Sequence, residues 1–189
     1  MGTQARGQGL LGENRLDVPR RNGDHLALIP RSFAPPRGPT PSEREKRPRM
    51  NVGDTFERRL RWSGAEIAEF ATLVGDHNPL HHDELYASQT RFGSLIASGT
   101  QPVAYLMAMC GSQATRERPG VGLEFNFKLV GPARVDDEIL FRWEVVGAEA
   151  SERPRGTLIS LRGEALGSDG KPIVTATAKT LLFTAPART

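Results

Sequence analysis

An acid and a base lie five positions apart in the stretch Asp76-His77-Asn78-Pro79-Leu80-His81. Together with the next two residues, this stretch holds three of the four histidines of the chain. A proline disfavours helical backbone at the residue before it, so Asn78-Pro79 is expected to turn the chain sharply. The turn would bring His81 back towards Asp76. A carboxylate and an imidazole held in this way can activate a water molecule between them.

A helix has to deliver Asp76 to this turn, and the preceding residues predict one. Ser63 and Glu66 have the Ser-x-x-Glu spacing of a capping box at a helix start. The apolar residues that follow recur with helical spacing, at Ile67, Phe70, Ala71 and Val74. We expect a strand over residues 55–62, ahead of this helix, and a short second helix over residues 83–89.

The next helix is expected to be the core of the fold. Gly99-Thr100 precede Pro102, and eight consecutive apolar residues then run from Val103 to Cys110. A helix that is apolar on every side is expected to be buried on every side.

The C-terminal half of the chain has the period of β-strands. Apolar residues alternate with polar ones from Leu123 to Leu129, which predicts a strand with one dry face. Further strands are expected over residues 139–146, 157–165 and 173–183, with a turn at 168–171. These elements predict an α+β fold in which a curved antiparallel sheet wraps a central buried helix.

Composition excludes several classes of protein. The single cysteine, Cys110, allows no internal disulfide and suits a reducing compartment, so a cytoplasmic location is expected. No apolar run approaches the roughly 20 residues of a membrane span, and no membrane partner is expected. Residues 1–49 hold ten Lys/Arg and five Asp/Glu, whereas residues 50–189 hold 15 and 17. The basic charge therefore lies in a segment with one aromatic residue, which argues against nucleic-acid binding.

Residues 1–49 are expected to be a disordered basic extension of a domain that spans residues 50–189. The segment holds seven of the 14 prolines and no sustained period, so it offers little apolar surface to bury. Met50 opens the patterned sequence and is an alternative start of the native protein. A targeting presequence is a competing interpretation, which the acidic residues disfavour.

The stretch from Phe70 to Asp83 resembles the hydratase-2 motif of the MaoC-like (R)-specific enoyl-CoA hydratases. The likeness continues through Tyr86-Ala87 and residues 92–99, and again through residues 124–128 and 135–137. It covers about residues 50–184, essentially the whole patterned region.

The resemblance implies a hot-dog fold and a homodimer, or a higher homo-oligomer, whose sheets join edge to edge. It also implies a hydro-lyase that interconverts trans-2-enoyl and (R)-3-hydroxyacyl thioesters of coenzyme A, as in fatty acid metabolism. By this analogy Asp76 and His81 activate the water, and the backbone N–H of Gly99 polarises the thioester carbonyl. No cofactor is implied beyond the coenzyme A or acyl-carrier thioester of the substrate itself.

Asn78, Ser98 and Tyr105 are the expected substrate-binding residues. Many members of the family have a histidine where this chain has Ser98, and several have a serine where it has Ala104.

The remaining polar residues near these motifs are not expected to take part in the reaction. His77 and His82 are expected to be exposed bystanders, and no metal site is expected. Arg116 and Arg118 are considered as contacts for the coenzyme A phosphates.

Two other functions stay open on the sequence. A hot-dog acyl-CoA thioesterase would use a carboxylate and water to cleave the thioester, although such enzymes usually lack Asp-x-Asn-Pro-x-His. A non-catalytic hot-dog subunit of a heteromeric dehydratase is the second alternative, and the intact Asp76 and His81 argue against it.

Overall fold

The computed structural model describes residues 50–116 and 118–183. Within them, five strands form one antiparallel sheet in the order β1-β3-β4-β5-β2. The strands are β1 Thr55–Arg61, β2 Gly120–Leu129, β3 Glu138–Glu152, β4 Arg155–Leu166 and β5 Pro172–Phe183. The helices are α2 Gly64–Leu73, α3 Glu84–Ser88 and α4 Thr100–Ala114, and the 3-10 turn η3 covers Pro79–His81.

This arrangement confirms the predicted α+β fold, and every predicted strand and helix is present. The largest difference is β3, which continues to Glu152, six residues beyond its predicted end. The predicted disordered segment 1–49 lies outside the described residues. None of the helices within the described residues is long and apolar enough to cross a membrane.

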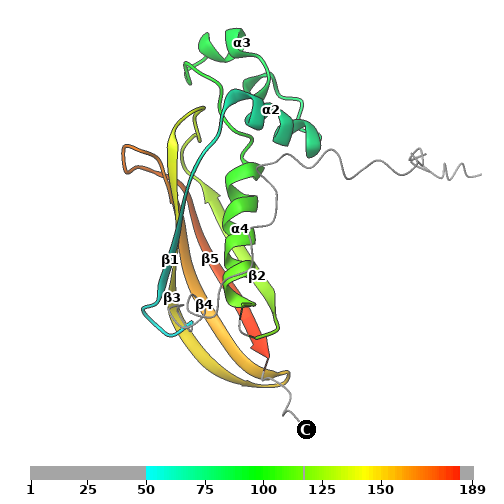
Figure 1. The fold of residues 1–189 in the computed structure, drawn as a ribbon, viewed down its shortest axis with the longest axis vertical. Helices are drawn as coiled ribbons and strands as arrows, with labels where there is room; N and C mark the ends of the chain where they lie inside the picture. Colours follow the sequence, from blue (N-terminus) through cyan, green and yellow to red (C-terminus); the bar gives the residue numbers. More distant parts are fainter. Residues whose placement is uncertain (1–49, 117, 184–189) are drawn as a thin grey trace, which may run out of the picture. The chain divides into compact units, whose positions relative to one another are not determined.

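The inner face of the sheet packs against α4, which lies along the strands (Figure 1). Trp143 on β3 is fully buried, and its indole N–H donates to the Leu106 carbonyl of α4 at 3.0 Å. Its register partner on β4 is Gly163, where a Cβ would lie 2.5 Å from the indole ring. The glycine therefore makes room for the tryptophan that fixes the helix to the sheet.

The prediction that α4 is buried on every side is wrong for the single chain. Leu106 and Cys110 face the sheet and are fully buried, whereas Ala104, Met107 and Ala108 are exposed. A single sheet covers one side of a helix, and an apolar run does not reveal which side that is. The outer face of α4 is therefore apolar but uncovered.

The predicted dry face of β2 is also largely open. Leu123 and Leu129 are each 58% exposed, although Phe125 and Phe127 pack against the core. β2 lies at the edge of the sheet, and its register against β5 shifts between Gly122 and Glu124, which interrupts the alternation of its faces at Leu123.

Candidate active site

The end of α2 determines where Asp76 lies. The chain leaves the helix through Gly75, whose φ of 76° is a left-handed conformation that glycine adopts without steric cost. The Gly75 N–H donates to the Thr72 carbonyl at 3.1 Å, and the Asp76 N–H donates to the Ala71 carbonyl at 2.8 Å. These two bonds form a Schellman motif, so the helix end itself fixes the backbone of Asp76.

Two side-chain turns then bring the chain back. Asp76 Oδ1 accepts the Asn78 N–H at 3.2 Å, and Asn78 Oδ1 accepts the Leu80 N–H at 3.1 Å at the start of η3. His81, the last residue of η3, is 5% exposed and returns to the helix end. Its Nε2 lies 3.2 Å from Asp76 Oδ2, so the acid and base expected from the sequence are in contact.

The backbone carbonyl of Ile96 determines how His81 is oriented. His81 Nδ1 lies 2.7 Å from this oxygen, and a carbonyl oxygen only accepts hydrogen bonds, so Nδ1 carries a proton. In the neutral imidazole, Nε2 then has a lone pair directed at the Asp76 carboxylate. At a separation of 3.2 Å, the two atoms are close enough for both to contact one water molecule.

The pKa of Asp76 is held below its ordinary value. The largest cause is a hydrogen bond from the Ser98 hydroxyl, which stabilises the ionised carboxylate. Desolvation acts in the opposite direction, whereas the Asn78 N–H and the nearby rings of His81 and His82 lower the pKa further. Asp76 is therefore an ionised base at neutral pH.

One short segment, residues 96–98, contacts both members of the pair. Ile96 binds His81 through its carbonyl, and the Ser98 hydroxyl lowers the pKa of Asp76. The segment is fixed in turn, because the Ala97 N–H donates to the Ala133 carbonyl at 2.8 Å. Ser98 is 1% exposed, and its hydroxyl also lies 2.8 Å from that of Thr100. Its position supports a role in holding Asp76 rather than the predicted contact with substrate.

The two neighbouring histidines differ in their contacts. His82 Nε2 lies 2.7 Å from the Asp76 backbone carbonyl, so this ring donates a hydrogen bond that closes the turn. His82 is exposed, as expected, and this contact gives it a structural role in the turn. His77 is exposed, as expected, and its ring centroid lies 6.5 Å from that of His82.

A cavity of about 580 Å³ opens beside His81. Gly99, the N-cap of α4, lies in its wall, and so does Asn78. A Cβ on Gly99 would lie 2.7 Å from Leu129 Cδ1, so glycine permits a close approach at this point. The first N–H groups of a helix lack partners within it and carry the positive end of its dipole, which favours a developing negative charge in the cavity.

Other predicted binding residues lie away from this cavity. Tyr105 belongs to an aromatic cluster, with its ring centroid 5.1 Å from that of Trp62 and 6.1 Å from that of Phe141, and it does not line the cavity. Arg116 follows the C-terminus of α4, a helix of 15 residues and hence about 22 Å from Gly99. Arg118 comes after it, and neither arginine lines the cavity beside His81.

Sequence reasoning missed several residues around the pair. The Ile96 carbonyl and two arginines of the cavity wall, Arg91 and Arg134, carried no recognisable motif. Within residues 50–116 and 118–183, no group of three histidine, cysteine or acidic side chains converges in a way that would hold a metal ion.

Comparisons with known proteins agree with this geometry. A family model described as MaoC like domain matches residues 43–160. The (R)-specific enoyl-CoA hydratase of Aeromonas caviae is 33% identical over 133 residues, which cover 66% of this chain and 94% of that protein.

A second relative and a solved structure extend the comparison. The 3-hydroxybutyryl-CoA dehydratase of Methylorubrum extorquens is 31% identical over 101 residues, covering 51% of this chain and 60% of that protein. The solved structure of the (R)-hydratase from A. caviae superposes with a TM-score of 0.63 at 26% identity, covering 70% of this chain and 96% of that one.

Proposed function

The chain belongs to the MaoC-like dehydratase family, and from this premise we propose that it interconverts trans-2-enoyl and (R)-3-hydroxyacyl thioesters of coenzyme A. The observation that carries the proposal is the 3.2 Å contact of His81 Nε2 with Asp76 Oδ2 beside a cavity that Gly99 also lines. It unites a water-activating pair with the N-terminus of a helix. These are the two groups that addition of water to an enoyl thioester needs.

In the hydration direction, Asp76 and His81 hold the attacking water. The water loses a proton to the pair as its oxygen forms a bond to C3 of the enoyl group. The electron pair of the C2=C3 bond moves to the thioester carbonyl, and the Gly99 N–H stabilises the resulting enolate oxygen. C2 then takes a proton from the pair, which restores the carbonyl and completes the addition of one water molecule. This acid–base route uses no group beyond the thioester carrier.

Substitution of either member of the pair tests these roles. We expect Asp76→Asn and His81→Ala each to lower turnover of a short enoyl-CoA by at least about 100-fold, since proton transfer by a positioned side chain contributes this much. His77→Ala is the matched control, because His77 is an exposed histidine of the same turn. Circular dichroism checks that each variant is folded. Near-normal turnover by either pair variant would show that its assigned role is wrong.

The thioesterase alternative differs in its product. Following free thiol and the absorbance of the conjugated enoyl group in one assay separates the two reactions. The proposed hydratase removes the enoyl absorbance without releasing thiol, whereas a thioesterase releases thiol. Turnover by the purified chain alone would also exclude a non-catalytic subunit.

We further propose that the active form is a homodimer joined through β2. Both β1 and β2 are edge strands, but they differ in composition. Exposed β1 residues include Glu57, Arg58 and Arg59, which discourage edge pairing, whereas β2 exposes Val121 and Leu123. The helix α4 packs against β2, and we propose that the same dimer covers its exposed apolar residues. We place this enzyme in the cytoplasm, where its lone thiol stays reduced.

A further inference from the structure

We propose that Arg91 and Arg134 bind the phosphate of the phosphopantetheine arm that carries the acyl chain. This inference rests on the proposed function, because it assigns the part of the thioester that does not react.

Both arginines belong to the wall of the catalytic cavity. They line the same cavity of about 580 Å³ as His81 and Gly99, although 42 residues separate Arg134 from Phe92, the neighbour of Arg91. No aspartate or glutamate is among the residues that line this cavity, although Asp76 contacts His81. The two guanidinium groups therefore give the lining itself a positive charge. A thioester with its carbonyl at Gly99 would extend its negatively charged arm along this wall.

Phe92 holds the two guanidinium groups in place. The Arg91 guanidinium carbon lies 4.9 Å from the centroid of the Phe92 ring, and Arg134 donates a hydrogen bond to the Phe92 carbonyl. Arg134 also lies 3.5 Å from the Ser94 hydroxyl. Among the described residues, neither arginine forms an ion pair with a carboxylate, and both side chains are exposed. Two ordered but uncompensated guanidinium groups are suited to phosphate, which they can bind with paired N–H donors.

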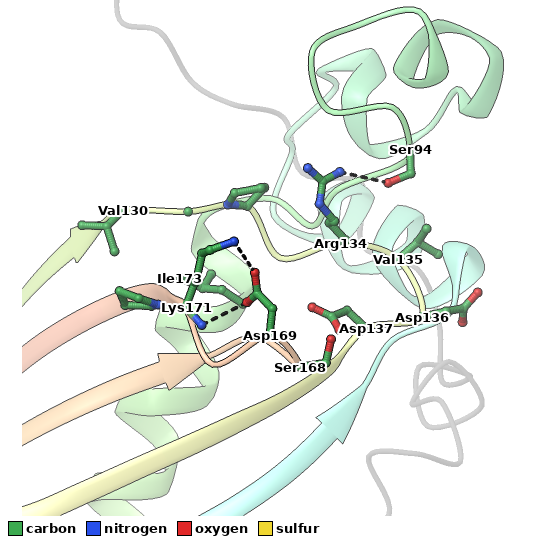
Figure 2. Close-up of a pocket in the computed structure, with 14 residues that line it drawn as sticks. Ser94, Val130, Arg134, Val135, Asp136, Asp137, Ser168, Asp169, Lys171 and Ile173 are labelled. Carbon is green, nitrogen blue, oxygen red and sulfur yellow. Dashed lines mark hydrogen bonds and ion pairs between the residues drawn. The ribbon is translucent and has the colours of Figure 1, made fainter.

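A neighbouring cavity of about 650 Å³ is less suited to phosphate than the catalytic cavity. It shares Val130, Gly131, Pro132 and Arg134 with the catalytic cavity but also contains Asp136, Asp137 and Asp169 (Figure 2). Its remaining cation, Lys171, is 2.8 Å from Asp169 and thus already paired. Three carboxylates against two cations make this cavity unfavourable for phosphate. In Figure 2, Arg134 is turned away from the carboxylates and towards Ser94.

Coenzyme A and the prosthetic group of an acyl carrier protein both contain a phosphate next to pantetheine, so either carrier could supply the group that the arginines bind. Three thioesters of one short enoyl acid separate the possibilities: the coenzyme A, phosphopantetheine and pantetheine esters. The last has no phosphate but presents the same reacting atoms to Asp76 and His81.

We expect Arg91→Gln to raise KM about tenfold for the coenzyme A ester, with little change in kcat, and to leave KM for the pantetheine ester unchanged. Loss of one charge-assisted hydrogen bond accounts for a change of this size. Arg134→Lys keeps the charge but loses the paired donors, and we expect the same pattern with a smaller effect. Arg155→Gln is the matched control, because Arg155 is exposed on the β3–β4 hairpin at the other end of the long strand β3.

The pattern across the three esters identifies the phosphate. A rise in KM for both phosphorylated esters supports the assignment of the arginines to the phosphate next to pantetheine. A rise for coenzyme A alone would place the arginines on its outer phosphates and would overturn this assignment. An equal rise for the pantetheine ester, or no rise for coenzyme A, overturns the inference. Calorimetric binding of coenzyme A gives a readout without turnover. This measurement tests phosphate binding by the arginines even if the wild-type chain hydrates none of the esters. Absence of hydration would refute the proposed function but not the binding role of the arginines.

Discussion

At the scale of single residues, the basic nitrogen of His81 is selected by a backbone atom that itself takes no part in the reaction. The Ile96 carbonyl fixes the proton on Nδ1 and leaves Nε2 facing Asp76. Ser98 has a corresponding effect on the acid, because its hydroxyl lowers the pKa of Asp76.

Removing the Ser98 hydroxyl should shift the pH dependence of the reaction. The hydroxyl stabilises the ionised form of Asp76 and lowers its pKa, so Ser98→Ala raises that pKa. The carboxylate then takes up its proton at a higher pH as the solution is acidified. We expect the acidic limb of the kcat/KM profile to move towards neutral pH.

Ser98→Thr is the control for this shift, since it keeps a hydroxyl at the same position. Its acidic limb should stay close to that of the wild type. An unchanged limb in Ser98→Ala, measured on a variant with the wild-type circular dichroism spectrum, would contradict the role assigned to this hydroxyl.

At the scale of elements, the N-terminus of α4 brings the oxyanion donor to the pair. Gly99 has a φ of −56°, which proline also adopts, so two substitutions here differ mainly in one hydrogen-bond donor. Gly99→Ala adds a Cβ but keeps the N–H, whereas Gly99→Pro removes the N–H as well. In both variants the added Cβ meets the end of the Leu129 side chain, which is 58% exposed and has room to move.

We therefore expect Gly99→Pro to have a kcat about 10²–10³-fold below that of Gly99→Ala, the usual effect of losing one oxyanion donor. Steady-state kinetics on a short enoyl-CoA measures the difference, and thermal melts check that both variants fold. Equal kcat values in the two folded variants would place the oxyanion donor elsewhere.

At the scale of the whole molecule, the described chain leaves apolar residues uncovered on both α4 and β2. Met107 is 47% exposed, Val121 44% and Leu123 58%. Edge strands with such residues offer unpaired N–H and C=O groups to another chain. These residues belong to the faces of α4 and β2 that were predicted to be buried but are open in one protomer. The proposed dimer would bury them.

A charge on the exposed face of β2 tests the proposed dimer. We expect Leu123→Lys to shift the protein from dimer to monomer in sedimentation velocity, because a lysine at a paired edge is costly to desolvate. Leu85→Lys is the control, since Leu85 is 71% exposed but lies on α3. A dimer that survives Leu123→Lys, or one that dissociates with Leu85→Lys, would place the interface elsewhere.

The sequence by itself determined the features that depend on neighbouring residues. The capping box of Ser63 and Glu66 forms as predicted, with Ser63 Oγ 3.3 Å from the Glu66 N–H. The turn at Asn78-Pro79 returns His81 to Asp76, a separation of five residues that one helix end and one turn can close. Such contacts follow from local backbone geometry, and for this reason the pair and the order of elements could be predicted.

The tertiary structure alone decided the contacts between distant residues. The Ile96 carbonyl lies 15 residues from His81, and the Phe92 carbonyl lies 42 residues from Arg134. These partners meet only because the sheet and α4 close around a common core, and no local pattern encodes a backbone oxygen as a ligand. The same closure decided which side of α4 is covered, since an apolar run has no preferred face until a sheet packs against it.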